Sequence, residues 1–303
     1  MMDKEKILVV TSSVDDTASY VIEKYKSDAD FVRLNIDRFN EYSFSVTENG
    51  WYITSDQERI CENDIRAIYY RKPMLPDVRE YEPRYRGMIQ RDIIALVNGI
   101  VDSFDGIVIS KPSVLRKAEN KIFQLIYAGK KGIAIPQSYI GNSNAYCDRF
   151  AEQKSIIKPI TTGKTLGDGG YELYQTSMFS GVTDDISLTP VYLQKYIDKA
   201  YEVRLTIIGE SVYPVRIDTI NKIDWRADYQ NHKYSIISVP DKVIFLCRKM
   251  LKEFSLIFGA FDFIVTPEGE WVFLEVNPNG QWLWLEERLR FDISKKIMDN
   301  LLG

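Results

Sequence analysis

Runs of apolar residues along the first third of the chain predict alternating strands and helices. The run KILVVTS (residues 6–12) is continuously apolar, as in a parallel strand covered on both faces. A helix is expected over residues 15–26, followed by a strand in DFVRLNI. FSVTENGWYIT has two alternating runs around Asn49-Gly50, which predicts a β-hairpin. A strand in IRAIYYRKP, a helix over residues 85–102 and a strand in GIVISKP would complete a small α/β domain.

The rest of the chain predicts a mixture of helices and antiparallel hairpins. Apolar residues at helical spacing, before a cation-rich KKG, predict one helix through VLRKAENKIFQLIYAGKKG. A strand is expected in QKSIIKPI, and the Gly-rich TTGKTLGDGG is expected to be a mobile hairpin or loop. Hairpins are expected at Gly209-Glu210 and at PEGE, with helices over residues 241–258 and 292–302.

Composition narrows the classes of function. A chain of 303 residues exceeds one compact core, so two or three subdomains are expected. The net charge of −4 gives no basic field for nucleic acid. No apolar run approaches the roughly 18 residues of a membrane span, and the start of the chain lacks a secretion signal. We therefore expect a cytoplasmic protein with no nucleic-acid or membrane partner.

Cysteine and histidine usage argues against disulfide, zinc and serine-hydrolase chemistry. Cys61, Cys147 and Cys247 are odd in number and far apart, so we expect buried thiols in a reducing compartment. His232 is the only histidine, and no G-x-S-x-G motif accompanies it. Zinc hydrolase sites usually need two or three histidines. Any metal is therefore expected to bind carboxylate and amide oxygens.

The segment WVFLEVNPNG carries such oxygens. Glu275 and Asn277 are two apart and share one face of a strand, while Val276 points to the other face, into a core. Pairing about the PEGE turn can bring Asp262 close to Glu275 across the hairpin. Three oxygen donors on one rigid face suit Mg²⁺. The alternative is an ordinary strand end with solvated polar residues.

Two lysines that would each, taken alone, be interpreted as solvated surface charges belong to an ordered series of motifs that favours phosphate binding. Lys121 and Lys158 precede the Gly-rich loop, which is followed by LQKYI, EVR, VYPVRID, an aspartate and then Glu-x-Asn. Lysines bind phosphate oxygens as point charges, and Gly-rich loops offer backbone N–H groups.

This series resembles the ATP-grasp superfamily over residues 110–303. The ending EVNPNGQWLWLE, together with YYRKP, resembles the ligases that cross-link ribosomal peptides of the microviridin or graspetide type. The resemblance implies an α/β and α+β architecture with an N-terminal pre-ATP-grasp domain (residues 1–113), a central lid subdomain (114–194) and a C-terminal subdomain (195–303).

The resemblance also implies roles for individual residues. Lys121 and Lys158 would hold ATP phosphates, and Glu202 would bind the ribose hydroxyls. The Mg²⁺ ligands would be Asp262, Glu275 and Asn277. The hinge strand would bind adenine through Gln194, Lys195, Tyr196 and Ile197, although the same strand taken alone could be ordinary core. Two departures are visible: QKYI lacks the acidic residue often found after Gln, and Glu202 stands where Asp is common.

In such ligases ATP converts a carboxylate into an acyl phosphate, which a hydroxyl or amine of the same peptide then attacks. We expect Arg216 to stabilise the charge that develops, with Arg204 as the other candidate. The alternative for either arginine is a surface ion pair with Glu202 or Asp218. The sequence identifies no general base.

Three functions remain open at this point. The first is a peptide macrocyclase acting on a ribosomal precursor peptide. The second is a ligase for small carboxylates and amines, or one that adds glutamate to a protein tail, and the third is a non-catalytic nucleotide-binding regulator. The macrocyclase needs a docking surface for a leader peptide. Asp184 and Asp185 are candidates for it, although Asp also favours helix N-caps. The resemblance further suggests a homodimer.

Overall fold

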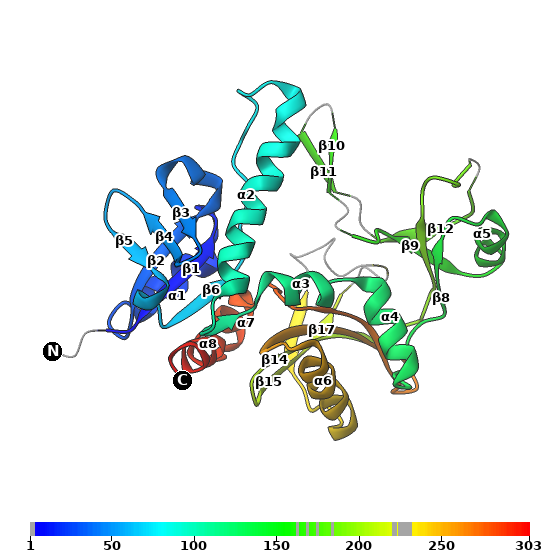
Figure 1. Ribbon diagram of the computed structural model, residues 1–303. Coiled ribbons are helices and arrows are strands. Elements are labelled where there is room, and N and C mark those ends of the chain that lie inside the picture. The colour runs from blue at the N-terminus through cyan, green and yellow to red at the C-terminus, as the bar shows by residue number, and fades with distance from the viewer. Residues whose placement is uncertain are drawn as a thin grey trace.

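The computed structural model describes residues 4–161, 164–167, 170–173, 176–182, 185–219, 223 and 232–303 (Figure 1). Its N-terminal part contains a parallel sheet in the order β2 (Asp30–Asn35), β1 (Lys6–Thr11), β6 (Ala67–Tyr70) and β7 (Ile107–Ile109). Flanking it are α1 (Asp16–Tyr25), α2 (Pro83–Ser103), the short 3₁₀ helices Ile36–Glu41 and Glu62–Asp64, and an antiparallel sheet of β3 (Ser43–Thr47), β4 (Gly50–Thr54) and β5 (Arg59–Cys61). The α/β domain and the Asn49-Gly50 hairpin predicted from the sequence are confirmed.

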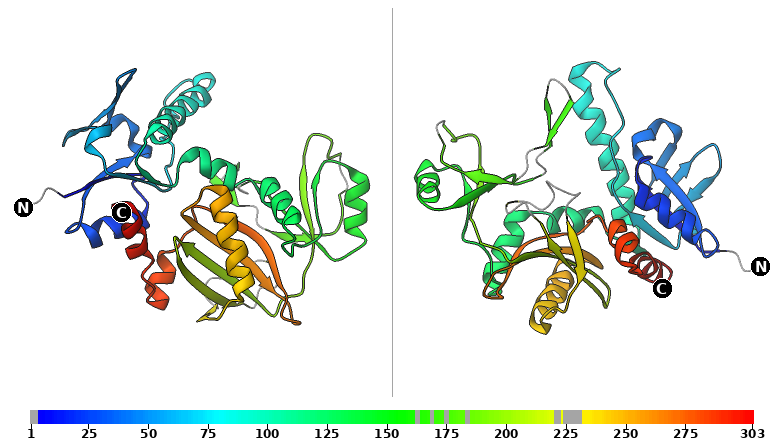
Figure 2. Two further views of the ribbon diagram at one scale, coloured as in Figure 1. Left: turned by 60° about the horizontal axis from the view of Figure 1, so that its bottom comes forward. Right: turned by 180° about the vertical axis from the view of Figure 1, so that it is seen from behind.

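The middle of the chain forms a separate antiparallel sheet, in the order β12 (Ser177–Phe179), β9 (Ser155–Lys158), β13 (Val191–Lys195) and β8 (Ser138–Gly141), with α5 (Asn144–Ala151) against it. The Gly-rich segment includes the paired strands β10 (Lys164–Gly167) and β11 (Gly170–Leu173), as a hairpin requires. Figure 2 shows this middle part standing apart from the N-terminal domain, across the helices α3 (Pro112–Ala118) and α4 (Lys121–Lys130).

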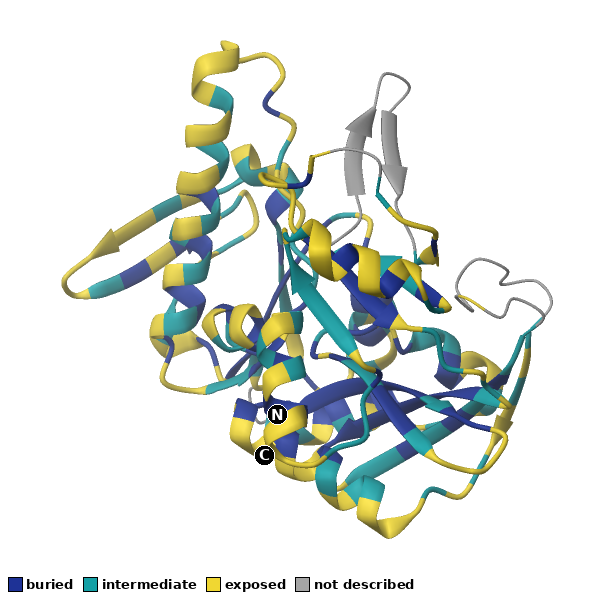
Figure 3. Ribbon diagram, turned by 90° about the vertical axis from the view of Figure 1, so that its right-hand side faces the viewer, coloured by how far each residue is buried: buried dark blue, intermediate teal, exposed yellow. Residues whose placement is uncertain are grey.

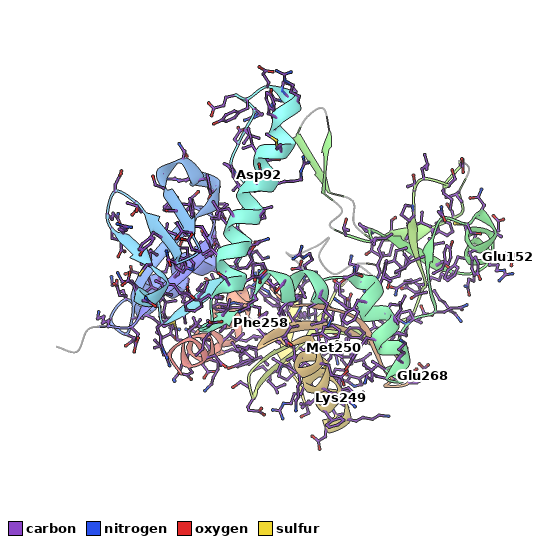
Figure 4. The ribbon with its side chains drawn as sticks, in the orientation of Figure 1. Asp92, Glu152, Lys249, Met250, Phe258 and Glu268 are labelled. Carbon is purple, nitrogen blue, oxygen red and sulfur yellow. The ribbon has the colours of Figure 1, made fainter. Side chains whose placement is uncertain are left out.

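The last third is built on a five-stranded antiparallel sheet, in the order β16 (Lys233–Ile236), β15 (Ser211–Asp218), β14 (Tyr201–Ile208), β17 (Phe258–Val265) and β18 (Trp271–Asn277). Helix α6 (Asp241–Phe254) packs on one face, and its Met250 is labelled in Figure 4. The buried strands of this sheet are dark in Figure 3. The domain limits proposed from the sequence, after residues 113 and 194, stay predictions.

Helices α7 (Leu283–Leu289) and α8 (Ile293–Leu302) return the chain to the N-terminal domain (Figure 1). Trp282, which is fully buried, lies in a core shared by β1, α8 and the start of β17. Lys24 of α1 forms an ion pair of 2.5 Å with the buried Glu286, which also accepts a hydrogen bond from the backbone of Ser294. The two ends of the chain therefore stabilise one another.

Two predicted helices differ from the structure. The expected helix through residue 118 breaks at Asn120, whose side chain accepts a hydrogen bond from Phe123 N and so begins a new helix, α4. The expected helix over residues 241–258 ends at Phe254, because Ser255 adopts a left-handed conformation with φ of 61°.

The structure also tests what was expected of the cysteines and of membrane spans. Cys147 and Cys247 are buried thiols, as expected, whereas Cys61 is only half-buried. Within the described residues, no helix is both long and apolar enough to cross a bilayer.

Candidate functional site

The carboxylates of β17 and β18 meet on one face of the C-terminal sheet. Asp262 pairs directly with Glu275, and Ala260 pairs with Asn277, so all three polar side chains share a face. Val276 is buried on the opposite face, as predicted. Asp262 itself is only 3% exposed, so its charge depends on protein partners.

A β-bulge decides which residues face Asp262. The register shifts between Asp262 and Phe263, because Phe263 pairs with Phe273 whereas Asp262 pairs with Glu275. Without this shift Asp262 would pair with Leu274, and Glu275 would turn to the core face. The bulge therefore creates the carboxylate pair.

Arg204 of β14 places a positive charge beside Asp262. It pairs with Asp262 in register, its Nε lies 2.8 Å from Asp262 Oδ1, and its Nη2 donates to Oδ2 at 3.3 Å. Both side chains are buried, so the guanidinium orients the carboxylate at low dielectric. Glu202 lies two residues earlier on the same face and is paired with Lys199.

Arg216 is not brought to this cluster. It pairs with Val203 rather than Arg204, so its side chain lies on the α6 face of the sheet, against the Tyr201 ring at 4.0 Å. Its guanidinium donates to both carboxylate oxygens of Asp218, and these bonds raise the pKa of Arg216. This geometry corresponds to the surface ion-pair alternative.

The two predicted phosphate-binding lysines have different surroundings. Lys121 begins α4, and its Nζ donates to Pro159 O at 2.8 Å and Thr161 O at 3.3 Å. The same Nζ lies 3.9 Å from Glu275 Oε2, which links the middle sheet to the carboxylate face. The Lys158 ammonium lies 4.4 Å from the centre of the Tyr192 ring, on the neighbouring strand. Lys121 thus lies beside the carboxylate pair.

The predicted hinge joins the middle sheet to the C-terminal sheet. Gln194 is buried, and its amide donates to Ser138 Oγ and to the Tyr192 hydroxyl, both at 2.9 Å. The backbone N–H groups of Lys195 and Tyr196 donate to carbonyls of neighbouring segments. These two donors are therefore already engaged within the protein, while Ile197 is half-buried.

The proposed leader-binding acids are only partly described. Asp184 lies outside the described residues. Asp185 is exposed and accepts hydrogen bonds from the backbone N–H and the hydroxyl of Ser187, which lower the pKa of Asp185. These bonds cap a turn rather than the helix considered from the sequence.

Gln124 was not identified from the sequence, although it holds strand β18 in place. Its amide donates to Val276 O at 2.8 Å and accepts from Val276 N at 2.9 Å. It also donates to Ala118 O at 2.7 Å. Because β18 is an edge strand, Gln124 supplies the pairing that a neighbouring strand would otherwise provide, between Glu275 and Asn277. A lone glutamine inside an apolar helix pattern was the available signal.

Arg71 of the YYRKP motif was also missed as a site residue. It is 1% exposed, and its guanidinium donates to Asn279 Oδ1, Gly280 O and Gln281 Oε1. Its Nε lies 3.5 Å from Asp15 Oδ2. The two family-like motifs of the sequence, YYRKP and NPNGQ, are thus bonded to one another.

An open cleft of about 790 Å³ lies between the N-terminal domain and the carboxylate face. We call it the interdomain cleft; it is bordered by residues 70–73, by helices α2, α3 and α4, and by residues 275–279. The charged side chains that line it, among the described residues, are Arg71, Lys72, Arg116, Glu119, Lys121 and Glu275. Cations outnumber carboxylates there, which favours an anionic occupant.

The donor set on the carboxylate face fits Mg²⁺. Two carboxylates and one amide oxygen from Asp262, Glu275 and Asn277 are hard ligands on rigid strands. This set has only two carboxylates, and among the described residues there is no cluster of three or more His, Cys, Asp or Glu side chains that could hold a metal by itself. A cation here would therefore complete its coordination with phosphate or water oxygens, as Mg²⁺ usually does.

No protein-family model and no curated protein matches the sequence. Among solved structures, the RiPP-associated ATP-grasp ligase of Chryseobacterium gregarium, in complex with ADP and a leader and core peptide, matches with a TM-score of 0.86 and 27% identity, over 98% of this chain and 96% of that one. The macrocyclase MdnC of Microcystis aeruginosa, bound with the precursor peptide MdnA, matches with a TM-score of 0.86 and 24% identity, over 98% and 99%. The ATP-grasp ligase PsnB, complexed with a minimal precursor, Mg and ADP, matches with a TM-score of 0.78 and 23% identity, over 98% and 97%.

The similarity extends over nearly the full length of each chain. It confirms the ATP-grasp fold and the resemblance to peptide-modifying ATP-grasp ligases that the motifs predicted.

Proposed function

We propose that this ATP-grasp protein is an ADP-forming ligase that closes macrocycles in a ribosomally made precursor peptide. It activates Asp or Glu side chains as acyl phosphates and joins them to Thr or Ser hydroxyls, or to Lys amines, as esters or amides. The observation that carries the proposal is the carboxylate face of Asp262, Glu275 and Asn277. Glu275 and Asn277 of this face line a cation-lined cleft together with Lys121. Two structures similar over nearly their full length support it: a RiPP-associated ATP-grasp ligase in complex with ADP and a leader and core peptide, and a macrocyclase bound with a precursor peptide.

ATP is proposed to lie between the middle sheet and the C-terminal sheet. Lys121 and Lys158 neutralise its phosphates, and the hinge from Gln194 through Lys195 and Tyr196 to Ile197 receives adenine. Two hinge N–H groups are engaged within the protein, so apolar contact with the hinge is proposed to contribute to adenine binding. Glu202 lies on the same face as Arg204, and we propose that it accepts from the ribose hydroxyls.

Mg²⁺ would be held by Asp262, Glu275 and Asn277, and it would neutralise the charge of the ATP phosphates. Arg204 orients Asp262 and adds a fixed positive charge on the same face. A carboxylate is a poor electrophile until its oxygen carries the phosphoryl group, and charge grows on the transferring phosphoryl as that bond forms. We therefore assign transition-state stabilisation to Arg204, because Arg216 lies on the other face of the sheet.

The peptide partner is proposed to occupy the interdomain cleft with its acidic core, while its leader docks elsewhere. Arg116 gives that cleft a cation for Asp and Glu side chains. Asp185, beside the fully exposed Leu188, together with Asp184, is the proposed leader contact. A homodimer in the cytoplasm completes the proposal.

Incubation of the protein with ATP, Mg²⁺ and the peptide encoded by a short neighbouring gene tests the proposal. Intact mass should fall by one water for each ring, with one ADP released per ring, and Glu275→Gln should abolish both. If the peptide stays unchanged while free amino acids are ligated, the small-substrate alternative is correct. If ATP is bound but not consumed with either, the chain is a nucleotide-binding regulator.

A further inference from the structure

Lys72 lies beside the loop that follows Asn277, which is a proposed Mg²⁺ ligand. The Arg71 backbone N–H donates to Val10 O, which extends the pairing of β1 with β6, and the Arg71 carbonyl accepts from the side chain of Asn279. The next residue, Lys72, therefore emerges against the loop that follows Asn277. Its half-buried side chain lines the interdomain cleft together with Glu275 and Asn277.

Most other charged or titratable groups that line the cleft are poor candidates for accepting a proton. Arg71 and Arg116 do not lose their protons in proteins. Lys121 donates to two carbonyls and lies beside Glu275, which is a proposed metal ligand. The Tyr70 hydroxyl donates to Asn98, and burial raises the pKa of Tyr70.

Two groups are left as bases for a nucleophile that must lose a proton in the cleft. They are Lys72 and Glu119, since the only histidine, His232, is not among the described residues that line it.

We infer that Lys72 is the general base that accepts the proton of the peptide nucleophile during ring closure, an inference that rests on the proposed function. The hydroxyl oxygen of Ser or Thr attacks the acyl carbon, and its proton passes to the neutral Nζ of Lys72. The bond from the acyl carbon to the phosphate oxygen breaks, and phosphate leaves with the electron pair. The ammonium of Lys72 then returns its proton to water.

The surroundings of Lys72 favour its neutral form. Burial, the largest cause, acts together with the neighbouring Arg71 guanidinium and with Arg204, and the net effect lowers the pKa of Lys72 to about 8. Asp15 and Glu119 act in the opposite direction. A primary amine with a pKa near the working pH is neutral often enough to accept a proton and basic enough to do so in the transition state.

Lys72→Arg separates this role from simple charge attraction, because arginine keeps the positive charge but does not become neutral. Two steps are measured with ATP, Mg²⁺ and the precursor peptide. Hydroxylamine traps the acyl phosphate as a hydroxamate without needing a base, and intact mass follows ring closure. We expect Lys72→Arg to form hydroxamate at close to the wild-type rate, while ring closure slows by roughly 10²–10⁴-fold.

The pH profile gives an independent readout. Since the neutral amine is the active form, wild-type ring closure should rise with pH through a midpoint near 8. Glu119→Gln removes a negative charge that raises the pKa of Lys72, so this midpoint should move to lower pH while ring closure persists. If Glu119 were the base, Glu119→Gln would instead abolish ring closure.

Each remaining outcome is decisive. Ring closure by Lys72→Arg at the wild-type rate would mean that only the charge is needed, and the inference would be wrong. Loss of hydroxamate as well as of ring closure would place Lys72 in substrate binding or activation, which also overturns it. A wild-type protein that forms neither product with the precursor would refute the proposed function itself.

Discussion

Gln124→Leu would test whether strand β18, which carries Glu275 and Asn277, depends on a helix side chain for its position. Leucine fills nearly the same volume but removes the three hydrogen bonds that the Gln124 amide makes with Val276 and Ala118. Val276 is 2% exposed, so water cannot readily replace the lost partner of its N–H and C=O groups.

The structure sets the expected size of the effect. A buried polar group left without a partner costs about 1–3 kcal/mol, so the two orphaned groups of Val276 together cost about 2–6 kcal/mol. The apolar leucine offsets part of this through its own burial, so we expect the lower half of that range. Gln124 also positions Glu275 and Asn277 indirectly, and loss of such outer partners typically weakens metal binding by roughly 10–100-fold.

Two measurements cover both effects. Urea unfolding reports the change in stability, and calorimetric titration with ADP in the presence of Mg²⁺ reports the change in affinity. Gln57→Leu is the matched control, because Gln57 is exposed in a turn remote from the site and the same substitution there should change stability by no more than about 0.5 kcal/mol. If Gln124→Leu behaves like Gln57→Leu in both assays, the bridging role argued from the hydrogen bonds is wrong.

Three further substitutions probe the same region. Glu275→Gln removes a ligand charge, and we expect turnover of the precursor to fall at least roughly 10²-fold with an unchanged circular dichroism spectrum; near-normal turnover would refute the metal-site proposal. Arg71→Met leaves Asp15 buried without its cation, and the free energy of unfolding should drop by about 3–5 kcal/mol, whereas the exposed Arg79→Met should have little effect in the same thermal scan. Gly280→Ala places a Cβ 2.7 Å from Ala260 Cβ, and the overpacking should cost about 1–3 kcal/mol. That loss should be relieved in a double-mutant cycle with Ala260→Gly, and additive effects would contradict the steric reasoning.

Local patterns in the sequence were sufficient for several features of the site. The alternation of a strand places Glu275 and Asn277 on one face whatever the rest of the chain does, and the PEGE turn brings the strand of Asp262 alongside. The Asn49-Gly50 hairpin and α1 likewise follow from short-range preferences, because turn geometry and helical periodicity act over a few residues. Oxygen donors in that arrangement already indicate Mg²⁺.

Local patterns could not predict on which face of the sheet the side chains of the neighbouring strands lie. A one-residue change of register reverses the face of every following residue, and only packing on both sides of the sheet selects the register. The bulge at Leu274 turns Glu275 toward Asp262, and the pairing of β14 with β15 puts Arg204, rather than Arg216, on that face. The sequence motif VYPVRID was therefore the weaker guide to the arginine that lies beside Asp262.

Contacts between distant segments were decided by the tertiary structure alone. Arg71 is bonded to Asn279, which is 208 residues away, and Gln124 to Val276, 152 residues away. Neither contact could be predicted from the local sequence, because each depends on buried polar groups that must be satisfied once the segments pack together. The sequence by itself determined the kind of chemistry and the residues of the Glu-x-Asn motif. Folding determined which arginine joins them, which glutamine holds their strand and which lysine shares their cleft, since these depend on the burial of polar groups across the whole molecule.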